Sequence, residues 1–116
     1  MSLDEIVREF ADCVAAQSDA MARADPKLGN RFAKRYIAAF ERLRSQGDEG
    51  REALAALLRD SRAEVRVMAA AYLLRYEHDE AKAVLEARAT GDGPVAFGAA
   101  QALQRWKGGT WALDPQ

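Results

Sequence analysis

The sequence predicts an all-α protein, and two features of its composition and pattern carry that prediction. Alanine, the strongest helix former, supplies 25 of the 116 residues, whereas valine, isoleucine and threonine together supply only ten. Breaks rich in glycine, proline and aspartate divide the apolar residues into about six segments with helical spacing. A domain built on a β-sheet is therefore excluded.

The first two expected helices form a helical hairpin over residues 1–47. Ser2 and Glu5 have the spacing of a capping box, and Asp25-Pro26 supplies a cap and a first-turn proline for the second helix. The connection is very short, which favours antiparallel packing. The expected apolar faces are Leu3, Ile6, Val7, Phe10, Val14 and Met21 in the first helix, and Leu28, Phe32, Tyr36, Ile37, Phe40 and Leu43 in the second.

Four shorter helices are expected in residues 48–110 of the same single domain, with residues 111–116 as a C-terminal tail. Three of them cover about 49–59, 62–76 and 79–89, and the last lies between Gly91-Asp92-Gly93-Pro94 and Gly108-Gly109. Ser61 and Glu64 have capping-box spacing, which predicts the start of the helix at 62–76. That helix is apolar on opposite faces, so we expect it in the centre of the fold.

An internal repeat relates residues 53–76 to residues 83–106. Six residues are identical at this offset, among them Ala69-Ala70 with Ala99-Ala100 and Leu73 with Leu103, and the aromatic Tyr76 coincides with Trp106. These positions have the phase that one helix would bury. We therefore expect the alanine pairs to lie where helices pack closely, with the two leucines filling the space between.

The repeated segment carries a family pattern. The first unit reads Leu57-Leu58-Arg59-Asp60-Ser61, then Val65-Arg66, Ala69-Ala70 and Leu73; the second keeps Val95, Ala99-Ala100 and Leu103, but has Ala96 at the arginine position. This pattern resembles a HEAT repeat, a paired-helix unit with an aspartate in its turn. The resemblance implies that the helix pairs stack as an α-α superhelix. The whole chain also resembles a small bacterial family with a HEAT-like C-terminal half that ends in a segment such as Trp106 to Trp111.

Arg66 is a charged residue on an otherwise apolar helix. A buried guanidinium needs a partner, since leaving it unpaired would cost about 3–5 kcal/mol. Asp60 or Asp92 is the expected partner, which gives Arg66 and Asp60 structural roles. A ligand contact is the alternative for Arg66.

The second expected helix concentrates positive charge. Residues 26–47 hold six bases and one acid, a balance of +5, whereas residues 1–25 come to −4. Five of these bases share one side of the helix, opposite its apolar face: Lys27, Arg31, Lys34, Arg35 and Arg42. Two interpretations of this stripe are open. It is a docking surface, which would bind an acidic protein or the phosphate backbone of a nucleic acid, or it is a solvated face beside the acidic first helix.

No catalytic or cofactor-binding set can be assembled from this sequence. Cys13 has no lysine or histidine at helical spacing to activate it, so a small core residue is expected. His78 is surrounded by Glu77, Asp79 and Glu80, which suggests either a metal site or, more simply, acids at a helix start. Trp106 and Trp111 either pack or, if exposed, contact a partner. We expect no metal and no cofactor.

These observations favour a non-catalytic protein–protein interaction module, and small proteins of this design include immunity and antitoxin partners. Nucleic-acid binding through the basic stripe is the alternative, and an enzyme built on Glu77, His78 and Asp79 is a third hypothesis. The longest apolar run, Val67 to Leu74, is far shorter than a membrane span. A cytoplasmic location is expected.

Overall fold

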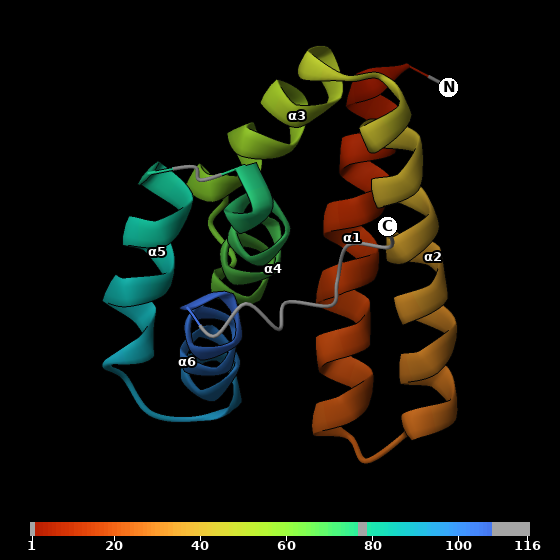
Figure 1. Ribbon diagram of the computed structural model, residues 1–116. Helices are drawn as coiled ribbons and strands as arrows, with labels where there is room; N and C mark the ends of the chain where they lie inside the picture. The colour runs from red at the N-terminus through yellow and green to blue at the C-terminus, as the bar shows by residue number, and fades with distance from the viewer. Residues whose placement is uncertain (1, 77–78, 108–116) are drawn as a thin grey trace. The chain divides into compact units, whose positions relative to one another are not determined.

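The computed structural model describes residues 2–76 and 79–107, and all regular structure within these ranges is helical (Figure 1). Six α-helices and two short 3₁₀-helices are present in the described ranges, which confirms the all-α class. The chain divides into two compact units, Met1–Leu57 and Leu58–Gln116. The third α-helix thus belongs to the unit that contains the hairpin.

The first unit contains α1 (Leu3–Ala22), α2 (Pro26–Ser45) and α3 (Asp48–Ala55). The capping box at the start of α1 is confirmed: the Ser2 hydroxyl accepts from the Glu5 main-chain N–H at 3.2 Å, and the Glu5 carboxylate accepts from the Ser2 N–H at 3.2 Å. The Asp25 carboxylate caps α2 by accepting from the Leu28 N–H at 3.1 Å. Local side chains therefore begin both long helices.

A short turn with left-handed backbone reverses the chain between α1 and α2. Ala24 has a φ of 59°, a conformation that usually selects glycine. Its N–H donates to the Met21 carbonyl at 3.0 Å, and the Asp25 N–H donates to the Ala20 carbonyl at 2.9 Å. These two bonds form a Schellman motif, which satisfies the last carbonyls of α1. The two helices then run antiparallel, as the hairpin prediction requires (Figure 1).

Apolar side chains from all three helices form the core of the first unit. The Phe10 and Tyr36 rings meet edge to face, with centroids 5.8 Å apart. The other large buried side chains of this unit are Ile6, Val14, Phe40, Leu43, Leu54 and Leu57.

Three side chains that were expected on the apolar faces are exposed to solvent. Met21 is 50% exposed, Leu28 36% and Ile37 44%. Met21 and Leu28 lie beside the turn, where each helix has fewer neighbours, and Ile37 lies at the border of its apolar face. The strip of helix surface that is covered is therefore narrower than the apolar face on a helical wheel.

α3 approaches the main chain of α2 more closely than any side chain would permit. A Cβ atom added at Gly50 would lie 1.8 Å from the main-chain oxygen of Leu43. Gly50 is buried, so the missing side chain is what allows this contact.

The second unit contains α4 (Ala63–Leu73), α5 (Asp79–Ala89) and α6 (Pro94–Lys107), which pack against one another. The 3₁₀-helices are η1 (Ala56–Arg59), which spans the boundary between the units, and η2 (Leu74–Tyr76), which follows α4. The break before α6 is confirmed, with Gly93 at a φ of 94° and Pro94 as the first helical residue. α4 is buried on several faces, through Val65, Ala69, Ala70, Ala71, Tyr72 and Leu73.

The predicted capping box at Ser61 and Glu64 is wrong. The residue at the N-cap of α4 is Arg62, and no side chain caps the helix. The Asp60 carboxylate instead accepts from the Arg62 N–H at 2.8 Å. Asp60 thus forms the turn that Ser61 was expected to form, because a carboxylate is the stronger acceptor.

The two predicted repeats differ in the burial of the second alanine of the Ala-Ala pair. Ala69, Ala70 and Ala99 are fully buried, and Leu73 and Leu103 lie in the core, but Ala100 is exposed. The expectation of close helix packing at Ala100 is therefore wrong. Exposed neighbours at helical spacing, Phe97, Gln101 and Gln104, show that this face of α6 is turned to solvent.

Within residues 2–76 and 79–107, none of the helices is both long and apolar enough to cross a membrane.

Replacing Gly50 of α3 and Gly98 of α6 by alanine should have opposite effects. Gly50→Ala should lower the free energy of unfolding by about 2 kcal/mol or more, because α3 must move away from Leu43. Gly98→Ala should raise it by about 0.5–1 kcal/mol, because a Cβ there meets open space and alanine is the better helix former. Urea unfolding of both variants checks this. Equal effects would contradict the close contact at Gly50.

Leucine should be tolerated at only one of the two equivalent alanines. Ala70→Leu overpacks a fully buried site and should lower the free energy of unfolding by about 1–3 kcal/mol. Ala100→Leu, on an exposed helix face, should change it by less than about 0.5 kcal/mol. Thermal unfolding of the two variants beside the parent chain measures the difference.

Candidate functional site

Five basic side chains stand on one exposed face of α2, which we call the α2 basic face: Lys27, Arg31, Lys34, Arg35 and Arg42. All five residues are exposed, as the solvated and the docking interpretations both require. Four of them, Lys27, Arg31, Lys34 and Arg35, have no carboxylate of a described residue within 4.0 Å. The acids of the neighbouring α1 therefore do not neutralise these four charges by direct contact.

Apolar groups lie along the borders of the α2 basic face. Around the helix, Leu28 lies next to Arg35 on one border of this face, and Ile37 lies on the other border. The side chains of Leu28 and Ile37 are both substantially exposed. The Arg35 guanidinium lies 5.8 Å from the centroid of the half-buried Phe32 ring. Tyr36 and Phe40 are buried, so no row of exposed aromatic rings accompanies the charges. The surface thus combines cations with aliphatic side chains.

A turn built on Asp60 precedes α4 in the second unit. The Arg62 guanidinium donates two hydrogen bonds to the Asp60 carboxylate, from Nε to Oδ1 at 3.0 Å and from Nη2 to Oδ2 at 3.1 Å. These hydrogen bonds hold the pKa of the Asp60 carboxyl below its usual value. Arg66 Nη1 donates instead to the Asp60 main-chain oxygen, at 2.7 Å. Asp60 is thus the partner of Arg66 through its main chain, while Arg62 binds its carboxylate.

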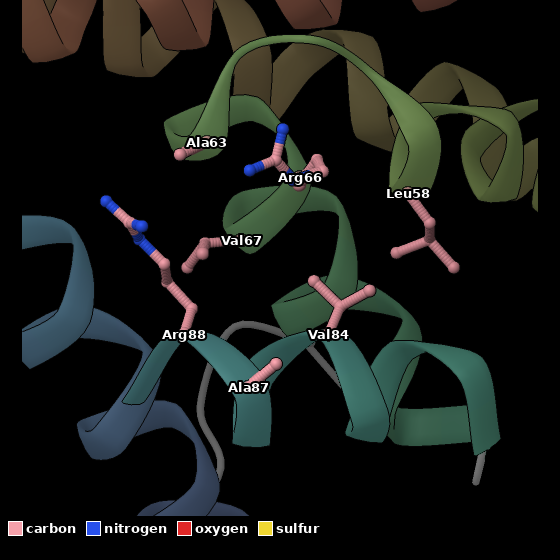
Figure 2. Close-up of a pocket in the computed structure, with 7 residues that line it drawn as sticks. All are labelled: Leu58, Ala63, Arg66, Val67, Val84, Ala87 and Arg88. Atoms are coloured by element: carbon pink, nitrogen blue, oxygen red, sulfur yellow. The ribbon is translucent and has the colours of Figure 1, made fainter. Parts of the chain in front are cut away.

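A hollow of about 330 Å³ lies between α4 and α5, which we call the α4–α5 hollow (Figure 2). Its lining is aliphatic except for two arginines: Leu58, Ala63, Arg66, Val67, Val84, Ala87 and Arg88. Figure 2 shows both guanidinium groups toward one end of the hollow, with Leu58 and Val84 toward the other. The hollow therefore has a cationic end and an apolar end.

Sequence reasoning did not find this hollow. Only Arg66 was considered as a ligand contact, and Arg88 was not considered at all. The available signal is that Ala63, Arg66 and Val67 have the spacing of one helix face, and Val84, Ala87 and Arg88 have the same spacing. Each triplet sets small or branched aliphatic residues beside one arginine, but only the packing of α4 on α5 brings the two faces together.

Two other residues with candidate roles are held by packing. Cys13 is only 3% exposed, and burial raises the pKa of its thiol, against a weaker opposing effect of the Arg35 charge. A thiol of this kind is a poor nucleophile. Trp106 is half-buried, and the Lys82 ammonium lies 5.5 Å from its ring centroid, which joins α5 to α6.

The candidate metal cluster falls largely on Glu77 and His78, which lie outside the described residues, as do Trp111 and the tail. Within the described residues, no three His, Cys, Asp or Glu side chains are grouped so that they could hold a metal ion. Glu80 is engaged elsewhere, with its carboxylate 3.4 Å from Arg59 Nη2.

The Asp60 turn should make stability depend on pH in the acid range. Asp60→Asn should lower the free energy of unfolding by about 1–2 kcal/mol at neutral pH, because it weakens the paired bonds from Arg62. Because the folded-state pKa is lowered, this contribution is complete above the ordinary value of 3.8 and is lost as the pH falls through the lower folded value. Urea unfolding across this range measures it.

The matched control for this variant is Asp92→Asn, at the exposed turn aspartate of the second predicted repeat. It should change the free energy of unfolding by less than about 0.5 kcal/mol at every pH. A difference between the parent chain and Asp60→Asn that did not shrink in acid would contradict the role of the carboxylate charge.

The comparisons with known proteins concern the whole chain. It is similar in structure to the protein RPA1889 from Rhodopseudomonas palustris CGA009, known from a crystal structure, with a TM-score of 0.88 and 26% sequence identity over 100% of this chain and 95% of that one. No curated protein matches it. Residues 4–106 match the family model DUF2019, a domain of unknown function. The match ends at Trp106 and covers both units, and the chain therefore belongs to the DUF2019 family.

Proposed function

We propose that this chain is a non-catalytic, HEAT-like helical module that binds another protein through the α2 basic face. The observation that carries the proposal is the set of exposed charges on α2, of which Lys27, Arg31, Lys34 and Arg35 have no carboxylate within 4.0 Å in the part of the chain that the structure describes. Unneutralised charges of one sign on one helix face attract an oppositely charged surface. The partner therefore has an acidic binding surface.

The burial pattern of α4 and α6 supports the HEAT-like part of the proposal. Helical repeats bury equivalent positions against neighbouring helices. Ala69 and Leu73 are fully buried in α4, and their equivalents Ala99 and Leu103 are 0% and 8% exposed in α6. Both helices thus bury these two equivalent positions, although they differ at Ala70 and Ala100.

The aliphatic borders of the α2 basic face favour a protein over a nucleic acid as the partner. Leu28 and Ile37 expose 36% and 44% of their surfaces, and burying such groups against apolar side chains stabilises a complex. A phosphate backbone offers no comparable apolar surface. The absence of exposed aromatic rings among the described residues of α2 also weakens the case for single-stranded nucleic acid, which binds by base stacking.

A specific form of this proposal is an immunity or antitoxin-like protein in the cytoplasm. Such a protein inhibits its partner by covering a surface, and it needs no catalytic group of its own. The buried free thiol of Cys13 is compatible with a reducing compartment. Two features of the sequence support this form of the proposal. The chain has a single free cysteine, and no catalytic set can be assembled from its residues.

Charge reversal on the α2 basic face should weaken binding to the partner. The experiment captures native-host proteins on the full chain and then measures the affinity of the acidic partner it identifies. Arg31→Glu with Lys34→Glu should weaken that affinity by about tenfold or more, mostly through slower association that added salt also slows. Both side chains are exposed and have no carboxylate partner among the described residues, so the fold should be retained.

The matched control is Lys107→Glu in α6, an exposed base of the other unit without a side-chain partner among the described residues. It should leave this affinity unchanged. A partner bound equally well by all the variants would contradict the proposal. A gel mobility shift of duplex or single-stranded nucleic acid that both salt and the charge reversals abolish would replace it with the nucleic-acid alternative.

A further inference from the structure

We propose that the α4–α5 hollow binds the C-terminal residue of a partner polypeptide, with its carboxylate at the arginine end and an aliphatic side chain at the other. This site lies in the second unit and shares no residue with the α2 basic face. The inference extends the proposed protein-binding function but does not depend on that face.

The cationic end of the hollow has guanidinium groups available to a carboxylate. Arg88 is exposed and has no side-chain hydrogen bond or ion pair to any residue that the structure describes. Arg66 makes one bond, from Nη1 to the Asp60 main-chain oxygen, which orients the group and leaves its other nitrogens without a described partner. The nearest acid, the Asp60 carboxylate, is already gripped by Arg62. Guanidinium groups bind carboxylates with paired, charge-assisted bonds.

The apolar end of the hollow fits an aliphatic side chain. Leu58 and Val84 line it, while Ala63 and Val67 lie on the side of the arginines and continue the aliphatic lining there (Figure 2). No aromatic ring contributes to the lining, and the two alanines, Ala63 and Ala87, leave space where larger residues would fill it. A branched side chain such as that of leucine would bury most of its surface among these groups.

The length of the hollow explains why a single residue fits it. Each helix contributes about one turn, Ala63–Val67 from α4 and Val84–Arg88 from α5, which corresponds to about 5 Å along the axis. A terminal residue carries its carboxylate and its side chain on the same Cα, so both can reach the two ends. The hollow is open, with Ala87 and Arg88 exposed at its rim, so the rest of the polypeptide can leave it.

The test is an NMR titration of the isotope-labelled full chain with an acetylated Gly-Gly-Ser-Ala-Leu peptide that has a free carboxylate. Amide shifts should concentrate in Ala63–Val67 and Val84–Arg88. The same peptide with an amidated C-terminus should bind at least about tenfold more weakly, because it offers no charge to the arginines. Arg88→Gln should weaken binding of the free acid to a similar extent.

Two further variants separate loss of the site from loss of the fold. Val84→Asp places a carboxylate inside the hollow and should abolish the titration while the remaining amide signals stay in place. Arg8→Gln, the same change of charge at an exposed arginine of α1, should leave binding unchanged.

Three results would overturn the inference. The first is equal binding of the free and amidated peptides, and the second is a set of shifts outside the two named turns. The third is binding of isocaproate, a free acid with the leucine-like body, as tightly as the peptide acid, which would make a small molecule the occupant. Because Arg31 and Lys34 are not used here, failure of this test leaves the proposed function of α2 standing, and the reverse also holds.

Discussion

The helices are held together mainly by apolar contact, and this constraint determines where the charged groups lie. Among the side chains that the structure describes, in residues 2–74, 76 and 79–107, none that is polar or charged is buried, and the core consists of alanine, aliphatic and aromatic side chains with Cys13. Helices that pack through alanine and glycine come close together, as where Gly50 of α3 contacts the main chain of α2. Such contacts leave no space for a solvated charge. Every described lysine, arginine, aspartate and glutamate must therefore remain at the surface, so the chemical character of the molecule depends on how its faces distribute these charges.

Both candidate surfaces follow from that distribution. On α2, the residues that pack, such as Tyr36 and Phe40, lie on the opposite side of the helix from Lys27, Arg31 and Lys34. The small residues Ala63 and Ala87 do not fill the space between α4 and α5. Arg66 and Arg88 therefore border the α4–α5 hollow instead of a closely packed interface. Cations beside accessible aliphatic groups occur in both places, and that combination suits binding better than catalysis.

The features that sequence reasoning predicted well depend on local interactions. The caps at Ser2 and Asp25, the helix at Asp79–Ala89 and the break before Pro94 are decided by residues within a few positions of one another. The prediction failed where two local solutions compete: Asp60 and Ser61 are adjacent, and the pattern does not show which one turns the chain. It also failed where the burial of a side chain depends on whether another helix covers it. A helical wheel gives the direction of Ile37 or Ala100 but not the presence of a neighbour. The α4–α5 hollow requires Arg66 and Arg88 to meet across two helices, which no local pattern reports.

The turn at Ala24 has a consequence for how the chain folds. Because only Arg23, Ala24 and Asp25 separate two helices of 20 residues each, much of the α1–α2 packing joins residues that are near one another in the sequence. Little chain entropy is lost in closing such a connection, and proteins rich in local contacts fold quickly. The turn whose hydrogen bonds satisfy the last carbonyls of α1 thus also keeps α2 close to α1 along the chain, which favours rapid formation of the hairpin.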